Sequence, residues 1–242
     1  MAHPEPLTLA DIAADPACLS RNATLPDGQP AQLRLLLPGD GDAFGRFLDE
    51  LGETTRSLYA PHPLDLAQGR QLCAELDYAG MAASPDPVAL RFVGLIEPGP
   101  AHIPTPRPQD AANAETTSRE RQFAARQDVG SYFILLLGVG DPTVERYRGH
   151  GVALDPGPTC TFAPVVADAY QNKGVGSALV PGVFDAARRL GFATCVLMGG
   201  TRTVNHRAIR YYEKAGFRTV GAFDTKSQDG ATIGNQDMVL AL

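Results

Sequence analysis

The sequence predicts an α/β fold in which helices flank both faces of a mixed central sheet. Three observations favour this class. Apolar segments of strand length alternate with helical segments through the second half of the chain. Strand segments stand at both ends of the predicted domain, which is typical of antiparallel pairing there. Hydrophobic residues make up 44% of the 242 residues, which is enough to bury a core.

The first half of the chain predicts an extension followed by the start of one domain. Residues 1–30 are rich in Ala, Pro and Asp and carry a turn signal at 25–28, so we expect an N-terminal arm or short hairpin. The domain is expected over residues 31–242. Its first elements are a strand at 32–37, a helix from Asp42 that stops at Gly52, a helix at 64–76 and a strand at 87–96.

A proline-rich segment interrupts the domain. Residues 97–128 contain five prolines between positions 98 and 108, followed by a polar stretch. Such a composition buries too little apolar surface to order itself easily, so we expect a flexible surface insertion. A strand at 131–139 follows, and the glycines and proline of residues 140–151 predict turns.

The second half alternates between strands and helices. The predicted elements are a strand at 159–168, a helix at 174–190, a strand at 193–199, a helix at 205–215, and strands at 217–224 and 232–241. The helix at 174–190 carries apolar residues on one face, and Gly191 ends it. Pro181 lies inside this helix and is expected to bend it, because proline lacks a main-chain donor.

The loop before that helix reads Gln171-Asn172-Lys173-Gly174-Val175-Gly176-Ser177. Glycines at a helix start leave main-chain N–H groups open at its positive end, where phosphate oxygens bind. No Gly-Lys-Ser/Thr follows at Walker spacing, and the third glycine of a dinucleotide fingerprint would fall on Leu179. The alternative is that the two glycines only make a tight turn.

A second motif lies downstream: Asn205-His206-Arg207-Ala208-Ile209-Arg210-Tyr211-Tyr212-Glu213-Lys214-Ala215-Gly216-Phe217. Together the two motifs resemble those of the GNAT acyltransferases, which pair a Gln/Arg-x-x-Gly-x-Gly/Ala loop with an Asn-x-x-Ala…Tyr-x-x-x-Gly-Phe helix. The resemblance is specific over residues 158–225 and thin over the rest of 31–242. It implies the GNAT-like acyl-CoA acyltransferase fold, with a mostly antiparallel sheet that is splayed open near its fourth strand.

The same resemblance implies contacts with acetyl-CoA. Main-chain N–H groups of the loop would hold the pyrophosphate, which assigns Gln171, Asn172, Lys173, Gly174, Val175, Gly176 and Ser177. Val165 and Val166 would present main-chain groups to the pantetheine arm and the acyl carbonyl. The charge of Lys173 is equally consistent with a solvated side chain.

Asn205 and Tyr212 share one helix face, because they are seven residues apart. By resemblance, Asn205 contacts the coenzyme, and the phenol of Tyr212, with an ordinary pKa of about 10, protonates the departing thiolate. The alternatives are a helix N-cap for Asn205 and a core aromatic for Tyr212. Tyr211 is the weaker candidate for the acid, because it lies about 100° away around the helix.

The sequence does not specify a general base. The conceivable residues are Glu97, Glu145, His150, Asp168 and Asp224. The net charge of −6 argues against a nucleic-acid partner and mildly favours a cationic acceptor. Four distant cysteines and five scattered histidines predict neither a disulfide framework nor a metal site. The chain shows no apolar run of about 20 residues and no signal-peptide pattern, so we expect a cytoplasmic protein without a membrane partner.

These observations predict an N-acetyltransferase that moves an acetyl group from acetyl-CoA to a primary amine of a small molecule or a protein. The acceptor is unidentified and a homodimer is left open. The first alternative is a non-catalytic acyl-CoA-binding or sensing module of the same fold. The second is a nucleotide-phosphate-binding protein, which the missing Walker lysine disfavours.

Overall fold

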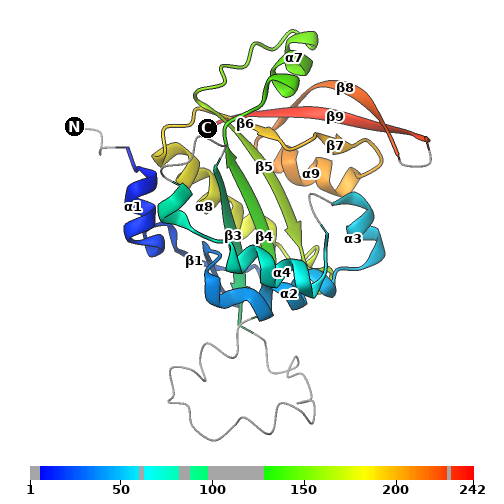
Figure 1. Cartoon of the computed structure of the whole chain (residues 1–242). Helices are drawn as coiled ribbons and strands as arrows, with labels where there is room; N and C mark the ends of the chain where they lie inside the picture. The colour runs from blue at the N-terminus through cyan, green and yellow to red at the C-terminus, as the bar shows by residue number, and fades with distance from the viewer. Residues whose placement is uncertain (1–5, 60–62, 82–87, 98–127, 228–229) are drawn as a thin grey trace, which may run out of the picture.

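The computed structural model describes residues 6–59, 63–81, 88–97, 128–227 and 230–242. The predicted insertion at 97–128 lies outside these residues except at its two ends. In the described part, one nine-stranded sheet has the order β1-β2-β3-β4-β5-β6-β9-β7, and β8 pairs with β9. Helices cover both faces of this sheet (Figure 1). The predicted class, a mixed and mostly antiparallel sheet flanked by helices, is confirmed.

The first five strands pair antiparallel in chain order. They are β1 (Arg21–Thr24), β2 (Pro30–Leu35), β3 (Val88–Ile96), β4 (Asp128–Leu137) and β5 (Thr159–Val166). Two short elements precede them, α1 (Leu9–Ala14) and a 3-10 helix (Pro16–Leu19). Because β1 and β2 form a hairpin within this sheet, residues 21–24 belong to the same sheet as the rest of the chain.

Between β2 and β3, the described residues form a 3-10 helix (Pro38–Asp40) followed by four α-helices, of which the first packs on one face of the sheet. The four α-helices are α2 (Gly41–Asp49), α3 (Glu53–Leu58), α4 (Leu66–Ala74) and α5 (Tyr78–Met81). In α2, Phe44, Phe47 and Leu48 repeat at helical spacing and are buried. The centroid of the Phe44 ring lies 4.7 Å from that of the Tyr132 ring of β4, and this contact fixes α2 on the sheet. The sequence pattern did not predict α3, whose N-cap is Gly52.

The long helix α8 (Val175–Arg189) covers the opposite face. Its apolar side is buried as the periodicity predicted, and the centroid of the Phe184 ring lies 5.3 Å from that of the Phe162 ring of β5. Pro181 lies within α8 without ending it. The helix therefore extends back along the sheet from its start beside the end of β5.

The turn expected at Gly140-Asp141-Pro142 is instead the start of α7 (Asp141–Gly149), a helix that the sequence did not predict, whereas the chain does turn at residues 150–151 after it. Gly140 is its N-cap, and Pro142 lies in the first turn, where a missing N–H costs nothing. The buried Tyr147 anchors this helix by donating its hydroxyl to the Met238 carbonyl at 2.8 Å. Glycine and proline here mark a helix start rather than a loop.

The last elements are β6 (Thr194–Leu197), β7 (Thr201–Arg202), α9 (His206–Lys214), β8 (Arg218–Lys226) and β9 (Thr232–Ala241). β6 runs parallel to β5, whereas β6, β7 and β8 each pair antiparallel with β9. Among the described residues, no helix combines the length and apolar character that crossing a bilayer requires.

Candidate functional site

The central sheet opens between β5 and β6. The two strands are neighbours over Thr159–Phe162 and Thr194–Leu197 only. The Met198 N–H still donates to the Phe162 carbonyl at 2.9 Å, but Gly199 and Gly200 then turn the chain away with φ of +68° and +71°. The last four residues of β5 keep β4 on one side and, in the described part of the chain, pair with no strand on the other.

Strand alternation decides which main-chain groups face this gap. The Phe162 carbonyl points toward β6, whereas the Ala167 N–H donates to the Gly130 carbonyl of β4 at 2.9 Å. The main-chain groups of the even-numbered residues of β5 therefore face the gap. Val166 therefore places its N–H there, whereas Pro164 has none to offer. Val165 turns its main-chain groups toward β4. Of the two valines selected from the sequence, Val166 is the one placed to donate to a ligand.

The start of α8 lies at the end of this edge. Gly174 is its N-cap with φ of +81°, a left-handed conformation that favours glycine. The helical ladder begins where the Ala178 N–H donates to the Gly174 carbonyl at 2.9 Å. The N–H groups of Val175, Gly176 and Ser177 precede this ladder at the positive end of the helix. This is the arrangement that binds phosphate oxygens.

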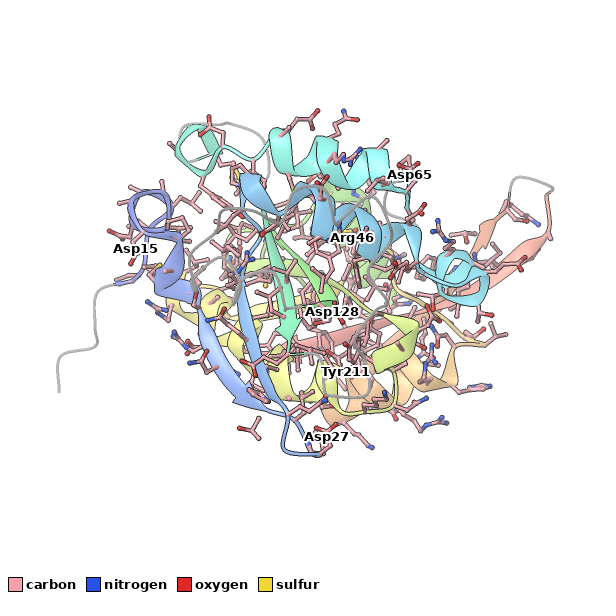
Figure 2. The ribbon with its side chains drawn as sticks, turned by 90° about the horizontal axis from the view of Figure 1, so that it is seen from below. Asp15, Asp27, Arg46, Asp65, Asp128 and Tyr211 are labelled. Carbon is pink, nitrogen blue, oxygen red and sulfur yellow. The ribbon has the colours of Figure 1, made fainter. Side chains whose placement is uncertain are left out.

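Gly176 has a different role from Gly174. A Cβ at Gly176 would lie 3.1 Å from the Tyr211 Cε2 atom and 3.5 Å from the Val166 Cγ2 atom. The missing side chain thus lets the Tyr211 ring pack between α8 and α9, where Figure 2 labels it. The Tyr211 hydroxyl is buried and has no hydrogen-bond partner within the described residues. Burial raises its pKa well above the usual value, and the neighbouring Tyr212 adds to this effect.

Gln171 braces the loop. Its Nε2 atom donates to the Val166 carbonyl at 2.9 Å and to the Thr55 hydroxyl at 3.0 Å. Its main-chain N–H donates to the Asp168 carbonyl at 3.3 Å, so that donor is already used. The Asp168 carboxylate in turn accepts from the Gly52 N–H at 2.9 Å and the Thr55 hydroxyl at 2.8 Å. These bonds tie α3 to the loop.

The two residues selected from α9 are both near the core. Asn205 is the N-cap of α9, and its Oδ1 atom accepts from the Ala208 N–H at 3.1 Å. Tyr212 is 8% exposed, and its ring centroid lies 5.6 Å from that of Phe217. Burial raises the pKa of Tyr212, and the nearby Cys195 thiol raises it further, so the phenol stays protonated at neutral pH.

These groups border one pocket of about 620 Å³, a size typical of small-molecule sites. Of the residues selected from the sequence, those that line it are Val165, Val166, Gln171, Asn172, Gly174, Val175, Gly176, Ser177, Asn205 and Tyr212. Lys173 is not among the lining residues, and its Nζ atom lies 5.6 Å from the centre of the Tyr170 ring.

The pocket also has walls that the sequence reasoning missed. Thr55 and Leu58 come from α3, and Tyr59 is its C-cap. The buried Tyr59 hydroxyl has no hydrogen-bond partner in the described part of the chain. No local pattern places α3 against a loop more than a hundred residues later. Tyr211, which the sequence offered only as the weaker candidate for the acid, lines the pocket as well.

The charged residues of the lining are all basic: Arg202, Arg207, Arg210 and Lys214. Among the described lining residues there is no Asp, Glu or His. The five conceivable bases, Glu97, Glu145, His150, Asp168 and Asp224, therefore lie elsewhere. This lining does not favour the cationic acceptor that the net charge of the whole chain suggested.

An open inner sheet edge beside a free helix N-terminus defines an acyl-coenzyme A acyltransferase fold. Residues 155–217 match the family model described as Acetyltransferase (GNAT) family. This range contains both motifs. This part of the chain is therefore similar to the GNAT family of acetyltransferases. A search of the curated proteins gave no match.

Solved structures of GNAT proteins share the fold. The GNAT domain of S. lividans PAT has a TM-score of 0.57 at 16% identity, covering 94% of this chain and 99% of that one. The putative acetyltransferase yncA from Salmonella typhimurium, solved with its cofactor acetyl-CoA, has a TM-score of 0.53 at 17% identity and covers 88% and 94%. The aminoglycoside acetyltransferase AAC(6')-Ib, solved with coenzyme A, has a TM-score of 0.53 at 17% identity and covers 87% and 93%. Identities this low establish the shared fold only.

Proposed function

We propose that this protein is an N-acetyltransferase that moves the acetyl group of acetyl-CoA to a primary amine by direct attack on the thioester. One observation carries the proposal. The free edge of β5 and the free N–H groups at the start of α8 border the same pocket. A single long ligand with a phosphate-bearing middle and an acyl end can use both. The N–H groups of Val175, Gly176 and Ser177 then hold the pyrophosphate.

In the proposed reaction the amine nitrogen attacks the carbonyl carbon of the thioester. The Val166 N–H donates to the carbonyl oxygen as negative charge develops on it. The C–S bond then breaks, and the Tyr212 hydroxyl donates to the departing sulfur. Burial raises the pKa of Tyr212 further above the value of about 8.5 for a thiol, so a hydrogen bond to the thiolate contributes more than complete proton transfer. The proton of the attacking amine leaves to water.

The remaining selected residues act indirectly in this proposal. Gln171 holds the carbonyl of Val166, and Asn205 holds the first turn of α9. Lys173 adds only long-range positive charge near the phosphates. We also propose a cytoplasmic location, which four cysteines without a disulfide bond support.

The second candidate function is an acyl-CoA-binding or sensing module that performs no transfer. A specific observation favours it: Pro164 stands at one of the two gap-facing positions beyond the last β6 contact, and it removes a donor that an acyl oxygen could use. Binding through α8 would be unaffected, whereas stabilisation of the oxyanion would depend on Val166 alone among the main-chain groups of this edge.

Two measurements separate these functions. Titration calorimetry with acetyl-CoA and with ATP tests whether the pocket is a coenzyme site. Release of free thiol from acetyl-CoA is then followed with a panel of primary amines, from amino acids to polyamines and lysine peptides. We expect binding of acetyl-CoA and amine-dependent thiol release. Binding without release by any amine would favour the sensing module, and tight binding of ATP alone would overturn both.

A further inference from the structure

We propose that Arg207, Arg210 and Lys214 of α9 form a subsite for the 3′-phosphate of the coenzyme. The protein would then select coenzyme A over 3′-dephospho-coenzyme A. This inference rests on the coenzyme binding proposed above, and it assigns a ligand group to side chains that the proposed reaction does not use.

The geometry of α9 separates these cations from the catalytic side. At about 100° per residue, Arg207 and Lys214 lie about 40° and 60° from Tyr211 in one direction around the helix, and Arg210 lies about 100° away. Tyr212 lies about 100° from Tyr211 in the other direction, and its side chain is buried. The three cations, which are exposed, therefore form one row on the outer flank of α9.

The row lies beside the start of α8. Tyr211 packs against Gly176, since a Cβ there would be only 3.1 Å from its ring. All three cations line the same pocket as the free N–H groups of α8. A pyrophosphate on those N–H groups has its nucleoside at the outer side of the pocket, because the acyl arm runs inward along β5. The 3′-phosphate of that nucleoside then meets the basic row.

The charges of the row call for an anion. No described residue forms an ion pair with Arg207, Arg210 or Lys214. Like charges three and four residues apart repel along a helix and cost a few tenths of a kcal/mol per pair. The chain as a whole is acidic, with 27 Asp and Glu against 21 Lys and Arg. A phosphate dianion relieves this local repulsion and gains charge-assisted hydrogen bonds.

The test is titration calorimetry of the full chain with coenzyme A and with 3′-dephospho-coenzyme A. Exposed ion pairs contribute little each, so we expect a combined preference for coenzyme A of roughly tenfold at low salt. The preference should shrink toward one in about 1 M salt, where screening is strong. The triple variant Arg207→Gln, Arg210→Gln, Lys214→Gln should lose it, while Gln keeps a helix propensity close to that of Arg and Lys.

The matched control is Arg218→Gln, which removes an exposed positive charge just after α9 but outside the pocket lining. It should keep the full preference. A triple variant with wild-type helicity that still prefers coenzyme A, or a wild-type protein that binds both ligands equally, would overturn the inference. If neither ligand binds the wild type, coenzyme binding itself is wrong, which is a different outcome.

Discussion

The contact between Gly174 and Pro26 offers a test of how the loop Gln171–Ser177, the proposed coenzyme loop, is held. A Cβ at Gly174 would lie 2.6 Å from Cγ and 2.9 Å from Cδ of Pro26, a rigid ring in the β1–β2 turn. Gly174 also has φ of +81°, which costs an Ala residue about 1 kcal/mol or more. Overpacking adds typically 1–3 kcal/mol. We therefore expect Gly174→Ala to lower the free energy of unfolding by about 2–4 kcal/mol.

The matched control is Gly191→Ala at the other end of the same helix. Gly191 has φ of +87°, but a Cβ there would meet nothing within 4 Å, so only the conformational cost of about 1 kcal/mol applies. Urea unfolding measures both variants, and calorimetry with coenzyme A should show weaker binding for Gly174→Ala alone. Adding Pro26→Ala to Gly174→Ala should recover the stability that Gly174→Ala loses beyond Gly191→Ala. The remaining Cβ of residue 26 lies 4.0 Å from a Cβ at position 174, which is an ordinary contact. Equal destabilisation of the two glycine variants would refute the reasoning.

Three further predictions concern the tyrosines of the structure. Tyr212→Phe should lower kcat by about 10²–10³-fold, the typical loss for one donor to developing negative charge, with little change in coenzyme affinity. Equal rates for wild type and Tyr212→Phe would make Tyr212 a packing residue. Tyr211→Phe should keep kcat and raise the melting temperature, because it removes a buried unpaired hydroxyl. Gly176→Val should displace the Tyr211 ring and so reduce both thermal stability and coenzyme affinity, and an unchanged affinity would place the pyrophosphate elsewhere. Burial raises the pKa of Tyr132 to about 12, so its contribution to stability is complete below pH 10 and is lost as the pH rises toward 12. Tyrosinate absorbance should therefore increase together with the loss of circular dichroism. Ionisation of the phenol well before unfolding would contradict this.

The second half of the fold was predictable because its patterns are local. Helix α8 and helix α9 follow from apolar spacing and from the glycines that end them, and β5 follows from a mostly apolar segment of strand length. Helix α7 was missed because Gly140 and Pro142 also favour turns. The opening between β5 and β6 is not a local property. It was expected only from the family resemblance, although Pro164 at the gap is a residue that a continuous ladder would not tolerate.

The site was predictable as a list of residues but not as a set of roles. The motif selected Gln171 and Gly176 as coenzyme-binding residues, and both line the pocket. In the structure, Gln171 braces Val166, and Gly176 leaves room for the Tyr211 ring. Sequence spacing gives the position of a side chain along a helix or a loop. It does not give the identity of its partner, which here comes from a distant segment of the chain.

Three such distant segments hold the loop Gln171–Ser177. Pro26 from the first hairpin contacts Gly174, Thr55 from α3 contacts Gln171, and Tyr211 from α9 contacts Gly176. A loop fixed from three sides has its N–H groups oriented before the ligand arrives, so binding pays little for ordering it. By linkage, a ligand that requires this loop geometry also stabilises the three contacts. Coenzyme binding should therefore slow amide exchange in α3, which lines the pocket, and also in the β1–β2 turn, which does not.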